Sequence, residues 1–254
     1  MRVDHAQIRN LLSMSTELDD YLTGVAAREA SHGFLGGATQ GCYRRLVDLL
    51  ASIYQQQQIS PAQVKVLDWG AGKGHISYLL RKAGFQVTSC DLRSGADDSS
   101  FSQRTPILEE QGITVQPLER ECDLPFDSGS FDLVVSFGVL EHVGDDLGSL
   151  KEIRRVLKPG GLFFFCFLPY FLSWTQRIAH LRGNYYHPVL YSKSDVRRLA
   201  QNAGFDLGGI WHGQLLPKNA LPNSNAVERI DRFLTNWTPL KYLATNLEGL
   251  MVAR

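Results

Sequence analysis

The sequence KVLDWGAGKGHIS, from Lys65 to Ser77, is the stretch that decides the fold. Its apolar start, which ends at Asp68, is typical of a buried strand, and a helix is expected to begin after the turn. The turn carries three glycines at alternate positions, Gly70, Gly72 and Gly74. Glycine permits positive φ and close approach of a ligand to the main chain. The free N–H groups and positive dipole end of the following helix suit a carboxylate or phosphate, so we expect a nucleotide-type site here.

A second strand is expected shortly after this turn. Apolar residues at helical spacing run from Ile76 to Ala83, and Gly84 is a natural end for that helix. The next apolar run, Phe85 to Cys90, ends at Asp91. A strand, helix and strand in this order imply two parallel strands with a right-handed crossover. Asp91 stands at about the distance at which dinucleotide-binding folds place an acid that binds ribose hydroxyls.

The rest of the chain continues the alternation of strands and helices. Further strands are expected at 115–118, 133–137, 162–168, 205–211 and 246–253. Further helices are expected at 39–57, 107–111, 145–157, 192–203 and 226–234. We expect one domain over 1–254, with a helical cap at 1–58, a cofactor-binding core at 60–168 and a substrate-side insert at 169–191.

The composition excludes some classes of function and favours one compartment. The chain has 254 residues, with 26 Lys and Arg against 26 Asp and Glu, so a nucleic-acid partner is not expected. The 4 cysteines include no C-x-x-C pair, which favours reduced thiols. The start lacks a signal-peptide core, and the strongest apolar run, Leu162 to Leu172, is too short to cross a bilayer. These features predict a cytoplasmic protein.

Several motifs resemble those of the class I S-adenosylmethionine-dependent methyltransferases, in the branch that acts on small molecules. They follow the order of that family across roughly residues 60–168: Val66 to Gly74, Asp91, Leu124 to Phe126, Ser130 to Ser136, Leu140 to Val143 and Leu157 to Gly161. The resemblance implies an α/β, Rossmann-like, mostly parallel seven-stranded sheet in the order 3-2-1-4-5-7-6, with the last strand antiparallel and helices on both faces. It also implies a ligand crevice at the carboxyl ends of strands one and four.

A nicotinamide-dependent dehydrogenase is the nearest competing interpretation. Its turn is usually G-x-G-x-x-G, whereas the third glycine here, Gly74, comes one residue early. Asp91 would repel a 2′-phosphate, which disfavours NADP but leaves NAD open. The later matches at Leu140 to His142 and at Lys158 to Gly161 favour the methyl donor.

The resemblance implies S-adenosyl-L-methionine as the cofactor. Asp91 is expected to bind the ribose, the glycine turn to line the methionine half, and Asp68 to orient the loop or the ammonium group. The adenine contact stays open between Glu121, Cys122 and Asp123. The expected cofactor-binding residues are Asp68, Gly70, Ala71, Gly72, Gly74, Asp91, Leu92, Cys122, Asp123, Leu124, Phe137, Gly138 and Val139.

Methyl transfer is an in-line displacement at carbon, so the protein mainly has to align the two reactants. A hydroxyl nucleophile also benefits from a base. His142, just beyond the fourth strand, is the first candidate for that catalytic role, and a purely structural role at a helix start is the alternative. His187 is the second candidate. Neither histidine has acids or cysteines at metal-binding spacing, so no metal is expected.

The acceptor is expected to be a small molecule, methylated on oxygen or on nitrogen or carbon. The insert from Pro169 to Tyr191 is rich in aromatics, which suggests an aromatic, lipid-linked or glycosidic acceptor unless these rings only cap the core. Arg177, His180 and Arg182 are candidates for contact with phosphate or with a membrane surface. Tyr21, Phe34 and Tyr43 are candidates to close over the ligand. The alternative function is a catalytically silent S-adenosylmethionine-binding regulatory or partner protein.

Overall fold

The computed structural model of the chain describes residues 19–28, 37–92, 105–183, 187, 189–217 and 225–254. Residues 1–18 and 29–36 of the expected N-terminal cap therefore lie outside the described residues, and the second of these ranges includes Phe34. Tyr185 and Tyr186 of the expected insert lie outside them as well.

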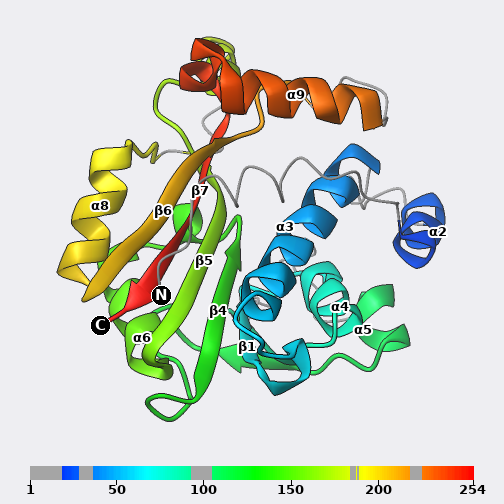
Figure 1. Cartoon of the computed structure of the whole chain (residues 1–254), viewed down its shortest axis with the longest axis vertical. Helices are drawn as coiled ribbons and strands as arrows, with labels where there is room; N and C mark the ends of the chain where they lie inside the picture. Colours follow the sequence, from blue (N-terminus) through cyan, green and yellow to red (C-terminus); the bar gives the residue numbers. More distant parts are fainter. Residues whose placement is uncertain (1–18, 29–36, 93–104, 184–186, 188, 218–224) are drawn as a thin grey trace.

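A seven-stranded sheet in the order β3-β2-β1-β4-β5-β7-β6 forms the centre of the molecule (Figure 1). Its strands are β1 Lys65–Trp69, β2 Gln86–Leu92, β3 Val115–Leu118, β4 Phe131–Phe137, β5 Leu157–Pro169, β6 Phe205–Gly213 and β7 Asn246–Ala253. Strands β1 to β5 pair in parallel, and β7 runs antiparallel to both β5 and β6. The expected strand order and the antiparallel last strand are confirmed.

Helices cover both faces of this sheet. The α-helices are α2 Asp20–Arg28, α3 Gly37–Gln55, α4 His75–Lys82, α5 Pro106–Glu110, α6 Asp146–Val156, α7 Trp174–Leu181, α8 Lys193–Asn202 and α9 Asn225–Trp237. Three short 3-10 helices are η2 Pro61–Gln63, η4 Leu140–His142 and η5 Pro239–Leu243. No helix in the described part of the chain is long and apolar enough to cross a membrane.

The core lies in two layers, one on each side of the sheet. Alternate residues of β5 point to opposite faces, as in any strand. Phe164 packs in the layer under α3 and α4, whereas Phe163 and Phe165 pack in the layer under α6 and α8. Trp69 at the end of β1 is also buried in the second layer, so it serves core packing, as its bulk suggests. Because both faces of the sheet are buried, its strands appear in the sequence as continuous apolar runs.

The structure differs from the expected elements at two places that matter for the site. Strand β2 continues to Leu92, so Asp91 lies within the strand rather than after it, because β2 goes on pairing with β3 there. The expected turn at Lys158 to Gly161 lies within β5, whose pairing with β4 is irregular at that point. The division of the chain into cap, core and insert stays a prediction.

Candidate functional site

The glycine turn ties the end of β1 to β2 and leaves no room for a side chain at its first position. The N–H groups of Gly70 and Ala71 both donate to the Cys90 carbonyl, at 2.9 and 3.0 Å. Gly70 has φ +79°, and a Cβ there would lie 2.4 Å from Cγ2 of Val139, which follows β4. Glycine is therefore required both by backbone conformation and by space. This contact brings together the carboxyl ends of strands β1 and β4, which were expected to form the crevice.

Asp91 is held beneath the middle of the turn by two backbone donors. The Gly72 N–H donates to Asp91 Oδ2 at 2.5 Å, and the Leu92 N–H donates to Asp91 Oδ1 at 2.7 Å. Burial raises the pKa of Asp91, and these two hydrogen bonds oppose that rise. A carboxylate accepts about four hydrogen bonds, so acceptor positions remain for two ribose hydroxyls. A Cβ at Gly72 would meet nothing closer than the Gly70 carbonyl at 4.0 Å, so the turn offers space for the expected cofactor.

Asp68 lies behind the turn rather than in it. Its side chain is buried, and Ser77 in the first turn of α4 donates a hydrogen bond to Oδ2 at 2.5 Å. Ser77 is in turn 2.8 Å from the Ser89 hydroxyl on β2. Burial raises the pKa of Asp68 to about 7. Asp68 thus joins β1 to α4 through a side-chain network, and its contact with the cofactor's ammonium group stays a prediction.

The residues expected near adenine differ in their surroundings. Glu121 Oε1 accepts a hydrogen bond from the Gly144 N–H at 3.0 Å, and therefore already has a structural partner. Leu124 is buried in the core, whereas Asp123 is exposed and Cys122 is half-buried. Leu92, next to Asp91, is 43% exposed. Asp123 is the most exposed of the three adenine candidates, and the role of each stays a prediction.

An aromatic cluster lies beside the end of β4. The Phe137 ring lies 6.1 Å from that of Tyr43 and 6.2 Å from that of Phe167, measured between centroids. Tyr43 also lies 4.8 Å from the His75 ring. Gly138, which follows Phe137, has φ +74° and donates to the Cys166 carbonyl at 3.1 Å. Tyr43, a residue expected to close over the ligand, is buried within this cluster.

Phe167 is a member of this cluster that sequence reasoning missed. It has φ +65°, in the left-handed region that a residue other than glycine rarely adopts. The pairing of β5 with β7 shifts between Phe165 and Leu168, so the chain bulges at Phe167. Such strain is found most often at functional sites. In the sequence, Phe167 is only one of several apolar residues in a run, and nothing there marks it.

A carboxyl group and two imidazoles meet just beyond the end of β4. The candidate ligand atoms of Glu141, His142 and His187 all lie within 4.8 Å of one another, and the two histidine rings are 5.3 Å apart. Glu141 is buried, and its Oε2 finds no hydrogen-bond partner among the described residues. No metal was expected because neither histidine has acids or cysteines at metal-binding spacing in the sequence. The fold nevertheless brings His187 beside Glu141 and His142 at the end of β4, so the metal-free site stays a prediction.

Burial sets the protonation of these three groups. It raises the pKa of Glu141 to about 8, lowers the pKa of His142, and lowers the pKa of His187 to about 4 with help from the neighbouring histidines. Near neutral pH the carboxyl therefore carries its proton and both imidazoles are neutral. A neutral imidazole accepts a proton, so this arrangement can serve a general base.

Comparison with protein families gives one match that covers most of the chain. A family model described as a methyltransferase domain matches residues 37–208. The matched segment contains the glycine turn, Asp91 and the three groups just beyond the end of β4.

Individual proteins show the same likeness. The ubiquinone biosynthesis O-methyltransferase of Methylococcus capsulatus is 28% identical over 180 residues, which cover 65% of this chain and 72% of that protein. The protein of the same name from Xanthomonas axonopodis is 30% identical over 167 residues, covering 61% of this chain and 67% of its own length. Other curated relatives align over only 40% or 38% of their own length.

Among solved structures, an S-adenosylmethionine-dependent methyltransferase of Thermotoga maritima, described as a possible histamine N-methyltransferase, has the same fold. It aligns with a TM-score of 0.56 and 14% identity, over 92% of this chain and 99% of its own.

Proposed function

We propose that this chain methylates an oxygen atom of a small-molecule acceptor. The premise is that the chain belongs to the methyltransferase-domain family and is an S-adenosylmethionine-dependent enzyme of class I. The observation that carries this proposal is the half-buried imidazole of His142 just beyond the end of β4, beside Glu141 and His187. The segment after β4 that carries His142 also carries Val139, which contacts the glycine turn at Gly70. An oxygen nucleophile has a proton to lose, and this group is placed to accept it. The O-methyltransferase names of the curated relatives agree with that choice.

The residues of the turn fit S-adenosyl-L-methionine, which supplies a methyl group already activated on a sulfonium. Asp91 retains acceptor positions for the ribose hydroxyls, and the space beside Gly72 admits the methionine half. We assign ribose binding to Asp91 and close main-chain contact to Gly70 and Gly72. Adenine contact is assigned to Cys122 and Asp123.

The chain's own contribution to the reaction is alignment, exclusion of water and removal of one proton. The cluster of Tyr43, Phe137 and Phe167 presents apolar surface beside the end of β4 and keeps water from the reacting atoms. Alignment of a bound nucleophile alone is worth up to roughly 7–11 kcal/mol in ideal cases. A ring nitrogen of His142 then accepts the acceptor's hydroxyl proton as the new bond forms.

The acceptor that best suits this site is a hydroxylated ring compound with an apolar substituent. Aromatic side chains gather at the end of β4, and the segment that follows β5 exposes further apolar residues. Phe171 before α7 is 44% exposed and Ile178 within it is 37% exposed. These residues are available to an apolar or lipid-linked tail of the acceptor.

A screen of candidate acceptors with isotopically labelled S-adenosylmethionine tests this proposal. We expect labelled product with phenolic or catecholic compounds, and more of it when they carry an apolar chain. The matched methyl ethers, whose hydroxyl is blocked, serve as controls and should take no label. Label found only on amines would contradict oxygen methylation. Tight donor binding with no transfer to any acceptor would instead support the silent regulatory protein.

Glu141, His142 and His187 offer a donor set that also suits a divalent cation. A chelator experiment distinguishes a metal site from a metal-free general base. We expect turnover to persist after dialysis against EDTA, because a neutral imidazole accepts a proton without a metal. The rate should change less than about twofold when magnesium or zinc is added back. Loss of turnover on dialysis, restored by a divalent ion, would contradict the metal-free proposal and assign Glu141, His142 and His187 as ligands.

A further inference from the structure

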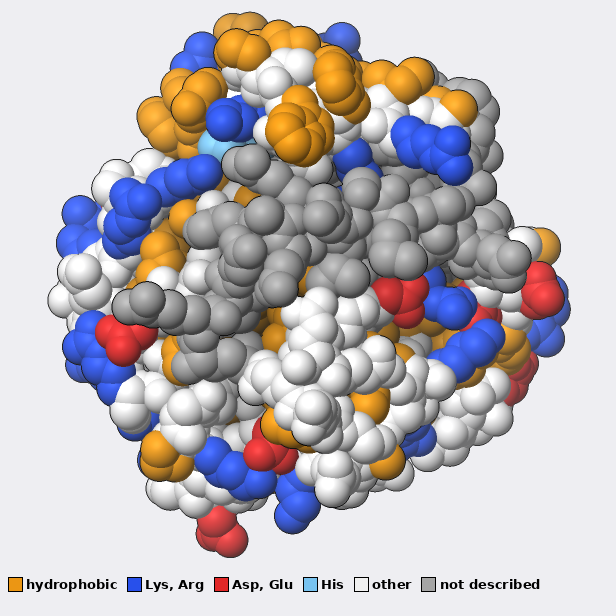
Figure 2. Space-filling model, in the orientation of Figure 1, with side chains coloured by type: hydrophobic (Ala, Val, Ile, Leu, Met, Phe, Trp, Pro, Cys, Tyr) orange, Lys and Arg blue, Asp and Glu red, His pale blue; other side chains and the backbone are white. Residues whose placement is uncertain are grey.

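Helix α9 turns its large apolar side chains away from the protein. Ile230, Phe233 and Trp237, which share one side of the helix, are 53%, 59% and 67% exposed. Residues three or four apart share a helix face, so these side chains form one apolar stripe. The following helix η5 adds Leu240, Tyr242 and Leu243, at 44%, 52% and 42% exposed. In Figure 2, hydrophobic side chains gather accordingly over the α9 end of the molecule.

The opposite side of α9 is polar and anchored to the body of the protein. Asp231 is buried, and its Oδ1 accepts hydrogen bonds from the N–H groups of Leu215 and Leu216 at 2.8 and 2.5 Å. Thr235, one turn later, is buried as well. A surface helix of a globular protein normally buries its apolar face and exposes its polar one. α9 does the reverse, so its apolar stripe is held outward by specific polar contacts.

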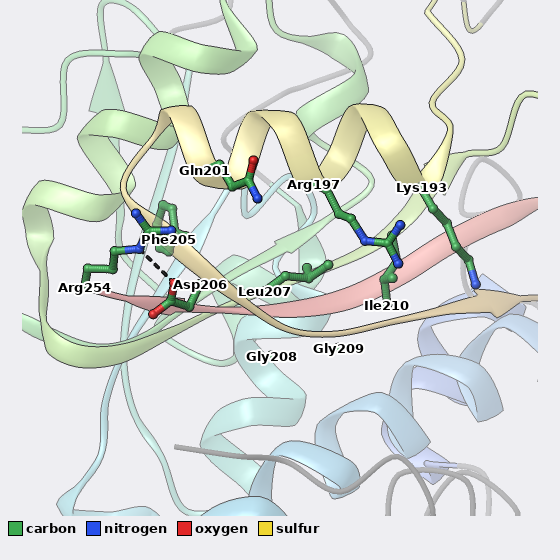
Figure 3. Close-up of a pocket in the computed structure, with 10 residues that line it drawn as sticks. All are labelled: Lys193, Arg197, Gln201, Phe205, Asp206, Leu207, Gly208, Gly209, Ile210 and Arg254. Carbon is green, nitrogen blue, oxygen red and sulfur yellow. Dashed lines mark hydrogen bonds and ion pairs between the residues drawn. The ribbon is translucent and has the colours of Figure 1, made fainter.

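Cationic side chains line a groove beside the edge strand β6. A cavity of about 440 Å³ lies between α8 and the edge strand β6, with Lys193, Arg197 and Arg254 among its lining residues. In Figure 3, Lys193 and Arg197 extend from α8 toward β6, where Gly208 and Gly209 carry no side chains. Arg254 is paired with Asp206 at 2.8 Å. No carboxylate of the described residues forms an ion pair with Lys193 or Arg197.

Helix η5 connects the apolar stripe to the edge of the cationic groove. It packs against α9 and β6, and its Tyr242 ring lies 5.6 Å from the His212 ring on β6. Burial, with repulsion from Lys241 and Arg197, lowers the pKa of Lys193 to about 8. The Lys241 ammonium lies 5.3 Å from the centre of the Tyr242 ring, one of the exposed apolar groups of η5. Like charges at one site are stabilised by an anionic partner.

We propose that α9, η5 and the start of α8 form a docking surface for an anionic lipid bilayer. The apolar side chains of α9 and η5 enter the interfacial region, while Lys193, Arg197 and Lys241 meet lipid phosphates. A soluble anion would account for the groove but not for the outward apolar stripe. An apolar protein partner would account for the stripe but not for the cations. This proposal goes beyond the proposed function and does not depend on it.

Vesicle flotation without cofactor or acceptor tests the docking surface directly. The whole protein is mixed with vesicles of phosphatidylcholine alone or of phosphatidylcholine and phosphatidylglycerol at three to one. We expect at least tenfold more bound protein with the anionic vesicles, and a fall in binding at high salt because the charges are then screened. Brominated acyl chains should quench tryptophan fluorescence, since Trp237 lies in the stripe.

Two kinds of variant separate the apolar and charged parts. Phe233→Ser is expected to weaken vesicle binding roughly tenfold, because the burial of one Phe side chain is lost. Lys193→Glu with Lys241→Glu should remove the preference for anionic lipid. Lys151→Glu, which reverses one exposed charge on α6, is the control and should bind as the unchanged protein does. Unchanged circular dichroism and donor affinity would show that each variant is folded.

Four results would overturn the proposal. Equal binding to neutral and anionic vesicles would show that the cations do not contribute. Binding to neither kind of vesicle would show that the surface does not dock on a bilayer. Equal vesicle binding by Phe233→Ser and the unchanged protein would show that the apolar stripe does not contribute to docking. Sedimentation showing a dimer that Phe233→Ser dissociates, without vesicle binding, would assign the surface to a second copy of this chain. Methyl transfer that proceeds with or without vesicles leaves these readouts unaffected.

Discussion

Replacement of Asp91 by alanine is expected to abolish measurable binding of S-adenosyl-L-methionine. The Asp91 carboxylate is fixed by the Gly72 and Leu92 N–H groups, so it is already oriented before the cofactor arrives. Each hydrogen bond to a charged group is worth about 1.5–3 kcal/mol, so loss of two ribose contacts lowers affinity by roughly 10²–10⁴-fold. Isothermal titration calorimetry with the donor and with its demethylated product measures this loss.

Two further variants separate cofactor binding from damage to the turn. Asp127→Ala removes an exposed acid away from the turn and should leave the dissociation constant unchanged. Asp91→Asn keeps an acceptor oxygen for one backbone N–H and should bind more tightly than Asp91→Ala. If Asp91→Ala binds the donor within a few fold of the unchanged protein, Asp91 is only a structural acid at the end of β2 and the assigned cofactor site is wrong.

Replacement of His142 by alanine is expected to lower kcat by about 10²–10⁴-fold while leaving donor affinity unchanged. The imidazole is half-buried just beyond the end of β4, next to Glu141 and His187, and it does not belong to the glycine turn. Its loss therefore removes proton transfer without removing cofactor contacts. Single-turnover kinetics with saturating donor measures the chemical step, and calorimetry measures the affinity.

The pH dependence of kcat provides an independent test of the same role. Burial lowers the pKa of His142 below its usual 6.5, so the neutral, proton-accepting form predominates at every pH above that lowered value. Turnover should fall only as the pH drops through the lowered pKa, and this acid limb should be absent from the residual rate of His142→Ala. Turnover of His142→Ala close to the unchanged enzyme across pH would make His142 structural. If His187→Ala, and not His142→Ala, shows this loss of turnover, the base is His187.

Much of the fold was predictable because its signals are local in the chain. Apolar runs, helical spacing and glycine turns reveal each element within a few residues of sequence. The strands at 115–118 and 246–253 match the structure at both ends. Boundaries failed where pairing with a neighbouring strand extended an element. Leu92 of β2 still pairs with β3, and β5 begins at Leu157, which pairs with Phe131 ahead of the irregular stretch.

The sequence by itself determined the glycine turn and the acid at Asp91, because each rests on residues close together in the chain. The seven-stranded order was implied by the resemblance of its motifs to those of a known family. Only the tertiary structure decided what depends on contacts between distant segments. It brought His187 beside Glu141 and His142, bent β5 at Phe167 toward Tyr43, and turned the apolar side of α9 outward. The physical reason is that a side chain's partners, and hence its burial, pKa and exposure, are set by packing across the whole molecule, which periodicity along one segment does not encode.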